Sequence, residues 1–370
     1  MIRVRTGIVK AIKASYDSVT EVVVEVEGLQ ELAVNYDPLT GPVKPGDRVI
    51  LNTTATRLAL GSGGHHFVMH VVGNDDLDPP SPGHIIKLRY TPWQVKCLSA
   101  EEESSPVRKE LEAFEGLDAM PVVVGELHSM VPAACAGIRA AVARRLRVAY
   151  LMTDGGALPI AYSKLVRALK DAGFLDVTIT AGNAFGGDYE VINIYSGLAV
   201  AKAVGADVVV VAMGPGIAGT GTKYGFSGIE QGQAINAVNS LGGTPVFIPR
   251  ISFADPRPRH RGLSHHTLTN LREVAVTPAV VCLPDLPRER WLVLRSQLDD
   301  GVIRKKHVIV TEDGAPGVSL LKESGIPVRT MGRGLDDDPE FFLAAAAAGS
   351  FAARVVMGCR FRILGDGETP

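Results

Sequence analysis

The sequence has few cysteines, no excess of charge of one sign and no long uncharged apolar run. The formal net charge of -2, with 21% charged residues, predicts neither a nucleic-acid-binding surface nor a polybasic membrane face. Lys202 and Asp207 interrupt the longest central apolar candidate before it reaches the roughly 18 to 20 residues of a membrane helix. The cysteines are far apart, so neither a disulfide framework nor a cysteine zinc site is predicted: Cys97, Cys135, Cys282 and Cys359.

Several sequence signals of location and catalysis are also missing. The first residues, "MIRVRTGIVKAIKASY", show no apolar core or cleavage pattern of a secretion signal, so we expect a cytoplasmic protein. There is no G-x-S-x-G, H-E-x-x-H or EF-hand pattern, which disfavours serine hydrolases, zincins and calcium sensors. These absences favour a small-molecule ligand over nucleic acid or membrane, and leave a homo-oligomer open.

The chain contains enough apolar residues for two domains. Its 370 residues, 46% of them hydrophobic, exceed the size at which a single core usually stops growing. Up to about residue 74, short runs of alternating apolar residues, such as Val22, Val24 and Val26, are separated by turns such as "KPGD". The acidic, proline-rich segment 74–84 then indicates a boundary. We therefore predict a small antiparallel, barrel-like β domain over residues 1–84.

Beyond this boundary, apolar strand candidates alternate with helix-like segments. This order predicts an α/β domain over residues 85–370, with a mainly parallel, Rossmann-like sheet between two helical layers. An alanine tract at 344–348 indicates a helix that begins at Pro339 with Asp338 as its cap, and 350–358 is interpreted as a possible returning strand. The seven strand candidates are 121–125, 147–152, 176–180, 206–213, 245–249, 279–283 and 307–311.

A glycine-rich segment, "GPGIAGTGTKYG" at 214–225, follows one of these strands. It matches G-x-G-x-x-G, but no helix follows at once, and the order Gly-Thr-Lys excludes a Walker loop. Successive amides and a lysine can nevertheless hold a phosphate or carboxylate. The alternative is a tight crossover whose glycines serve close packing alone. The predicted anion-binding residues are Gly214, Gly216, Gly219, Gly221, Thr222 and Lys223.

Two further glycine loops, 152–164 and 181–193, also follow strands. Because the carboxyl ends of parallel strands share one edge of the sheet, we expect these loops to border the same pocket. Asp154, with Gly155 and Gly156 beside it, or Asp188 is predicted to bind ligand hydroxyls or a divalent ion such as Mg²⁺, and Asp188 is also a catalytic candidate. Oxygen ligands favour magnesium or manganese over zinc. Helix capping is the alternative for both aspartates.

A polar loop, "RISFADPRPRHRGLSHHTLTN" at 250–270, follows the next strand. Its length favours a functional role. Asp255, Arg257 and Arg261 are predicted to bind an anionic ligand, and His265 or His266 to transfer a proton. The alternative is a solvated basic loop in which Ser264 caps the helix of the histidine pair. For four further residues that follow strands, turn or cap duty is the preferred interpretation: Glu126, His128, Glu312 and Asp313.

Long blocks of the chain resemble an uncharacterised bacterial family, domain of unknown function 3866. The resemblance includes "MTDGGALPIAYSKLVRAL", "AMGPGIAGTGTKYGFSGIEQGQ" and "IPRISFADPRPRHRGLSHHTL". It implies a bacterial cytoplasmic protein and supplies no reaction. The residues themselves favour an enzyme that binds a phosphorylated or carboxylated metabolite, or a nucleotide, and carries out hydrolysis or group transfer. The alternative is a non-catalytic sensor that binds a metabolite in the same pocket.

Overall fold

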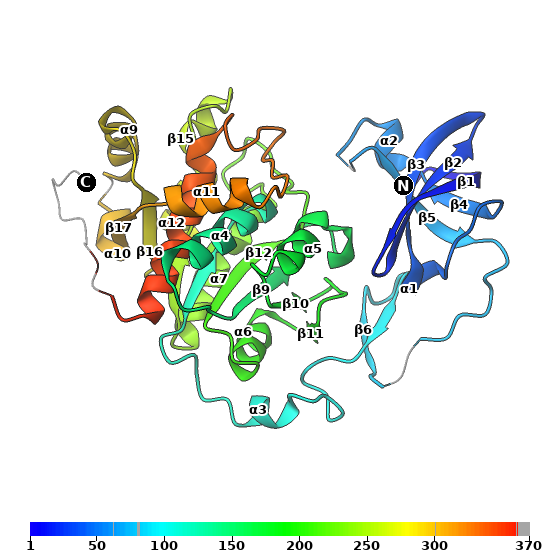
Figure 1. The fold of residues 1–370 in the computed structure, drawn as a ribbon, viewed down its shortest axis with the longest axis horizontal. Helices are drawn as coiled ribbons and strands as arrows, with labels where there is room; N and C mark the ends of the chain where they lie inside the picture. Colours follow the sequence, from blue (N-terminus) through cyan, green and yellow to red (C-terminus); the bar gives the residue numbers. More distant parts are fainter. Residues whose placement is uncertain (62, 80–81, 300, 360, 362–370) are drawn as a thin grey trace. The chain divides into compact units, whose positions relative to one another are not determined.

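The computed structural model describes residues 1–61, 63–79, 82–299, 301–359 and 361. The chain divides into two compact units, Met1–Cys97 and Leu98–Pro370 (Figure 1). Each unit has its own core, so each is described separately.

The first unit is a closed five-stranded barrel. Its neighbouring strands pair in antiparallel fashion except for β3 and β5, which are parallel. Val22, Val24 and Val26 lie in the barrel core, as their alternation predicts. The elements are β1 (Val4–Tyr16), β2 (Val19–Val26), β3 (Leu29–Tyr36), α1 (Asp37–Thr40), β4 (Arg48–Asn52), α2 (Thr54–Arg57), β5 (His65–Val71), and the hairpin β6 (Ile85–Lys87) and β7 (Val95–Cys97).

The second unit is built on an eight-stranded, wholly parallel sheet in the order β11-β10-β9-β12-β8-β13-β16-β17. All seven predicted strands are present, which confirms the α/β class. The three-residue β11 is additional and was not predicted. The strands are β8 (Pro121–Val124), β9 (Val148–Thr153), β10 (Val177–Ala181), β11 (Tyr189–Val191), β12 (Val208–Met213), β13 (Thr244–Phe247), β16 (Val280–Pro284) and β17 (Val308–Glu312).

Helices cover both faces of this sheet, which confirms three layers. Along each buried strand, successive side chains point to opposite faces. Val123 and Tyr150 pack with α4 and α12, whereas Val122 and Leu151 pack with α6 and α7. The helices are α3 (Arg108–Glu112), α4 (Val131–Ala141), α5 (Lys164–Asp171), α6 (Ile194–Ala203), α7 (Glu230–Ser240), α8 (His265–Thr269), α9 (Arg288–Leu298), α10 (Ile303–Lys306), α11 (Ala315–Glu323) and α12 (Pro339–Val356).

The strand predicted at 350–358 is wrong, because α12 continues to Val356. A Cβ added at Gly137 of α4 would overlap the carbonyl oxygen of Ala346, and one at Gly349 would overlap that of Ala134. The two helix backbones therefore approach so closely that only small side chains fit, which explains the alanine tract. Within the described chain, α12 alone is long and apolar enough to cross a membrane, but 72% of it is buried in this unit.

The strand order reverses around β8, at the centre of the sheet. The helices after β8 and β9, α4 and α5, pack on one face, whereas α7, after β12, packs on the other. The hairpin of β14 (Ile251–Ser252) and β15 (Gly262–Leu263) follows β13 and leads into α8. The connections that leave neighbouring strands at this point therefore run to opposite faces of the sheet. In α/β proteins such a reversal forms a crevice at the carboxyl ends of the strands, where ligands bind.

Candidate functional site

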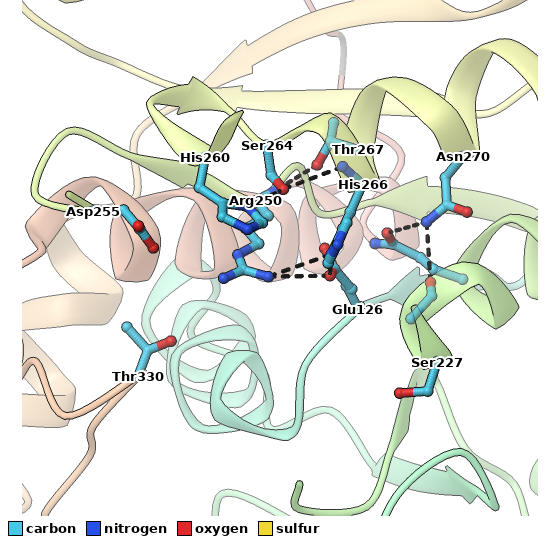
Figure 2. Close-up of polar contacts among 12 residues, drawn as sticks. Glu126, Ser227, Arg250, Asp255, His260, Ser264, His266, Thr267, Asn270 and Thr330 are labelled. Atoms are coloured by element: carbon cyan, nitrogen blue, oxygen red, sulfur yellow. Dashed lines mark hydrogen bonds and ion pairs between the residues drawn. The ribbon is translucent and has the colours of Figure 1, made fainter. Parts of the chain in front are cut away.

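A buried carboxylate lies at the reversal of the sheet. Glu126 follows the end of β8, and its side chain is fully buried. Its Oε1 lies 2.5 Å from Nδ1 of His266 on α8 and 3.3 Å from Nη1 of Arg250, which follows β13. Figure 2 shows Arg250 and His266 both directed at this carboxylate. Two segments far apart in the sequence, the residues after β8 and the polar loop 250–270, therefore meet at the carboxyl ends of β8 and β13.

Side-chain amides hold these segments together. Gln231 Nε2 donates to the carbonyl oxygens of Val124 and Ile248, 2.9 Å from each, and so joins the ends of the two strands. Asn270 Nδ2 donates in turn to the carbonyl of Gly228 at 3.0 Å. Asn270 opens a π-helical turn, Asn270–Val274, a distortion that is frequent at functional sites. The surroundings of Glu126 are therefore rigid.

Three histidines gather beside Glu126. His260, His265 and His266 each place a ring nitrogen within 4.8 Å of those of the other two. Nδ1 of His260 lies 2.8 Å from Ser264 Oγ, and the same hydroxyl accepts from the backbone N–H of His266 at 3.2 Å. This confirms Ser264 as the cap of α8. Phe226 stacks on His266, with ring centroids 3.8 Å apart and planes 2° from parallel.

Two of these histidines, His260 and His265, have a lowered pKa, which favours their neutral form. Burial lowers the pKa of His260 to about 3, and the nearby cations Arg250 and Arg257 act in the same direction. Burial, followed by His266, also lowers the pKa of His265. Around Glu126, three of the buried atoms that lack a hydrogen-bond partner among the described residues are Nε2 of His265, Nε2 of His266 and Oε2 of Glu126. Such atoms are uncommon in native structures and call for a functional explanation.

The glycine-rich segment folds back on itself beside His266. The N–H of Thr220 donates to the carbonyl of Gly225 at 2.7 Å, and that of Ser227 donates to Ala218 at 2.8 Å. A Cβ at Gly219 would lie 3.5 Å from the His266 ring, whereas Gly221 faces open space. Of the glycines in this segment that were predicted to bind an anion, Gly216 alone has a positive φ, 95°. Thr222 turns its hydroxyl to Thr220, at 2.8 Å.

For the other predicted glycines, close packing explains the residue type. A Cβ at Gly156 would overlap the carbonyl oxygen of Gly214, and one at Gly214 would overlap that of Ala157. A Cβ at Gly155 would lie 2.8 Å from the carboxylate of Glu230. Gly155, Gly156 and Gly214 therefore allow the loops after β9 and β12 to touch.

A cavity of about 90 Å³ opens between the glycine-rich segment and the histidines. Arg257 is bound through two nitrogens to the buried Asp255, at 2.9 and 2.7 Å, and this contact with Arg257 lowers the pKa of Asp255 despite burial. Arg259 has no ion-pair partner in the described part of the chain. The polar side chains of the lining are Thr220, Arg250, Arg257, Arg259, His260 and His266.

Lys223, Asp188 and Arg261 lie elsewhere, as does Asp154, so the predicted site residues do not all border one pocket. Lys223 pairs at the surface with Glu273, at 2.7 Å, and this contact raises the pKa of Lys223. Asp188 immediately precedes β11 and accepts from Lys170 and from the backbone N–H of Thr178, near the amino ends of the strands. Arg261 lines a separate cavity of about 590 Å³ beside α9. Arg261 directly follows His260 in the sequence but lines the other cavity.

Asp154 lines a second cavity, of about 290 Å³, together with Glu230 and Asn193. Burial raises the pKa of Glu230 to about 7, and Asp154 adds to this effect while a hydrogen bond from Thr153 opposes it. Asp154 accepts from the backbone N–H of Asn183 at 3.1 Å. Neither Asp154 nor Asp188 caps a helix, because Ser163 caps α5 and Asn193 caps α6.

Sequence reasoning underrated Glu126, for which turn or cap duty was preferred. The available sequence signal for a functional role of Glu126 was its position directly after a central strand of the sheet. His128 is also buried, between the hydroxyls of Tyr150 and Ser163, and burial lowers its pKa to about 4. Asp313 accepts from the backbone N–H of Ala315 at the start of α11, in keeping with cap duty. Arg250 and His260 had been noted only as members of the basic loop.

The fold and the site define the class: a three-layer α/β protein with a buried polar cluster at the reversal of its parallel sheet. Residues 32–349 match a family described as "Protein of unknown function (DUF3866)", and the chain belongs to this family, as its blocks indicate. No curated protein matches the chain.

Proposed function

We propose that the chain is a cytoplasmic bacterial enzyme that binds a small phosphorylated or carboxylated metabolite and catalyses its hydrolysis or a group transfer. The observation that carries this proposal is the cavity at the sheet reversal. Its lining includes three arginines and two histidines beside the Gly219–Thr220 backbone. Guanidinium groups and backbone amides are the donors that recognise phosphate and carboxylate oxygens.

The cavity suits one charged group of the ligand. Its volume of about 90 Å³ is well below the roughly 300–1000 Å³ of pockets that enclose a drug-sized molecule. Arg250 and Arg257 are already oriented by Glu126 and Asp255, whereas Arg259 is exposed and available to close on the ligand. These arginines replace Lys223 and Arg261 as the proposed anion donors.

The histidines favour an enzyme over a sensor. A sensor needs donors that hold its ligand, and the arginines of the cavity meet that need. The buried Nε2 atoms of His265 and His266, which lack partners among the described residues, belong to the cluster that borders the anion cavity. Imidazole nitrogens in that position provide chemistry beyond binding.

A binding screen tests the proposal. Inorganic phosphate, sugar phosphates, nucleotides and acyl-phosphate analogues would be compared by thermal shift and calorimetry, with and without added divalent metal, and each ligand would be recovered and analysed. We expect a phosphorylated or carboxylated compound to bind and to be converted. A ligand that binds tightly and is recovered unchanged would favour the sensor.

A matched pair of arginine variants locates the site. Arg259→Gln removes a cation from the proposed cavity, and loss of a charge-assisted contact should weaken binding about tenfold or more. Arg261→Gln makes the same change two residues away, at the separate cavity, and should leave affinity unchanged. Equal effects of the two substitutions would refute the cavity as the binding site.

A further inference from the structure

The histidine cluster combines two independent features of a metal site. Three imidazoles from two segments, the turn at His260 and the start of α8, bring their nitrogens within 4.8 Å of one another. In addition, the Nε2 atoms of His265 and His266 are buried and lack hydrogen-bond partners among the described residues. The side chain of His266 is only 4% exposed, so water does not satisfy its nitrogen from bulk solvent.

We propose that His260, His265 and His266 bind one divalent transition-metal ion, of which Zn²⁺ is the representative, and that Glu126 positions His266 for this role.

In His260 and His266, one ring nitrogen has a hydrogen-bond partner and the other ring nitrogen is left for the ion. Glu126 Oε1 is hydrogen-bonded to Nδ1 of His266, and Ser264 Oγ is hydrogen-bonded to Nδ1 of His260. Metal-binding histidines generally use their second ring nitrogen in this way, and the partner fixes the ring orientation and tautomer. Stacking on Phe226 additionally holds the plane of His266. The ion would therefore lie on the Nε2 side of His260 and His266.

The spacing of the nitrogens is compatible with tetrahedral coordination. Zinc–nitrogen bonds of roughly 2.0 to 2.1 Å place tetrahedral ligand nitrogens about 3.4 Å apart. The ring nitrogens of the three histidines lie within 4.8 Å of one another, so small rotations of the rings toward the ion bring them to this spacing. His265 is partly exposed and stands at the first position of α8, so it can turn without disturbing the core.

The chemical type of the metal-binding side chains favours a transition metal over magnesium. Imidazole nitrogens suit zinc, copper, iron and nickel, whereas magnesium prefers oxygen ligands. Of the two aspartates for which a magnesium ion was considered, Asp188 is instead bound to Lys170 and Thr178. Three neutral ligands also leave the charge of the ion unbalanced and its fourth position open, as in catalytic zinc sites. An oxygen of the anionic metabolite fits that position, and this catalytic role rests on the proposed function.

Metal binding is measurable without any substrate. The full chain would be stripped with a chelator, dialysed and titrated with Zn²⁺ by calorimetry. The visible spectrum of Co²⁺ would separately report whether nitrogen or thiolate ligands are bound. We expect one ion per chain, with nitrogen ligation. Glu126→Gln should weaken binding roughly 10- to 100-fold, as for other partners of metal-bound histidines, and His265→Gln should weaken it further.

Controls separate the site from surface binding. His70→Gln removes an exposed histidine, 43% accessible, from the barrel and should leave the stoichiometry and affinity unchanged. His265 is partly exposed, so the His265→Gln variant should fold, and circular dichroism would check this.

A metal-stripped parent protein that binds no Zn²⁺ or Co²⁺, or a folded His265→Gln variant that binds as tightly as the parent, would overturn the inference. Anion binding by the metal-free chain would still support the proposed function, so the two failures are distinguishable.

Discussion

Replacing Glu126 by glutamine tests whether the centre of the site is a charge-balanced cluster. The substitution keeps the shape of the side chain and one carbonyl oxygen but removes the negative charge. Arg250, whose side chain is 5% exposed, would then be a buried cation without an anionic partner. The neighbouring histidines cannot replace that charge, because an imidazole is either neutral or positive.

The expected loss of stability is large. At the 3.3 Å separation of Arg250 Nη1 and Glu126 Oε1, Coulomb's law with an effective dielectric constant of about 20 gives an attraction of about 5 kcal/mol. Removing one partner of a buried pair costs roughly 3 to 5 kcal/mol in measured cases. Because the glutamine oxygen still accepts a hydrogen bond, we expect a loss of about 3 kcal/mol.

Urea unfolding of metal-free protein measures this loss. The buried Trp291 reports on the second unit, and a Trp93→Phe background removes the tryptophan of the first unit. The double variant Glu126→Gln/Arg250→Met should recover much of the lost stability, because it removes the unpaired cation. Glu273→Gln makes the same change in an exposed pair with Lys223 and should have little effect. A loss below about 1 kcal/mol for Glu126→Gln, or no recovery in the double variant, would refute charge balance as the reason for the cluster.

Two further predictions concern the second cavity and the core. The pKa of Glu230 is raised from 4.5 to about 7, so the folded state holds a proton that the unfolded state has lost, and stability should fall as pH rises between these values. Glu230→Gln should therefore gain about 3 kcal/mol relative to the parent between pH 4.5 and 8 in urea unfolding, and a pH-independent difference would contradict the raised pKa. Gly137→Val should destabilise by roughly 1 to 3 kcal/mol or more, because α4 and α12 leave no room for a side chain. Ala140→Val, at a half-buried position of the same helix, should change the thermal midpoint less, and equal effects would contradict this packing.

Local pattern was sufficient for most of the fold. Each predicted strand of the α/β domain is a short apolar run, and such runs, alternating with helix-like segments, are typical of a parallel sheet that is buried on both faces. The segment at 350–358 misled because its small and apolar residues suit a strand as well as a helix. Contact with α4 favours the helix, since Gly349 and the alanines of α12 allow the backbone of α4 to approach closely.

The sequence by itself determined the barrel-like β sheet near the N-terminus and the parallel sheet that follows it, because these depend on apolar periodicity and chain direction. Tertiary structure alone decided which polar residues meet. Glu126 and His266 are 140 residues apart, and they touch because β13 lies beside β8. Lys223 and Arg259 are both cations in predicted binding loops, yet one pairs with Glu273 and the other lines the cavity. Strand order and side-chain direction arise from packing across the whole sheet, and residue type and spacing in one segment do not encode them.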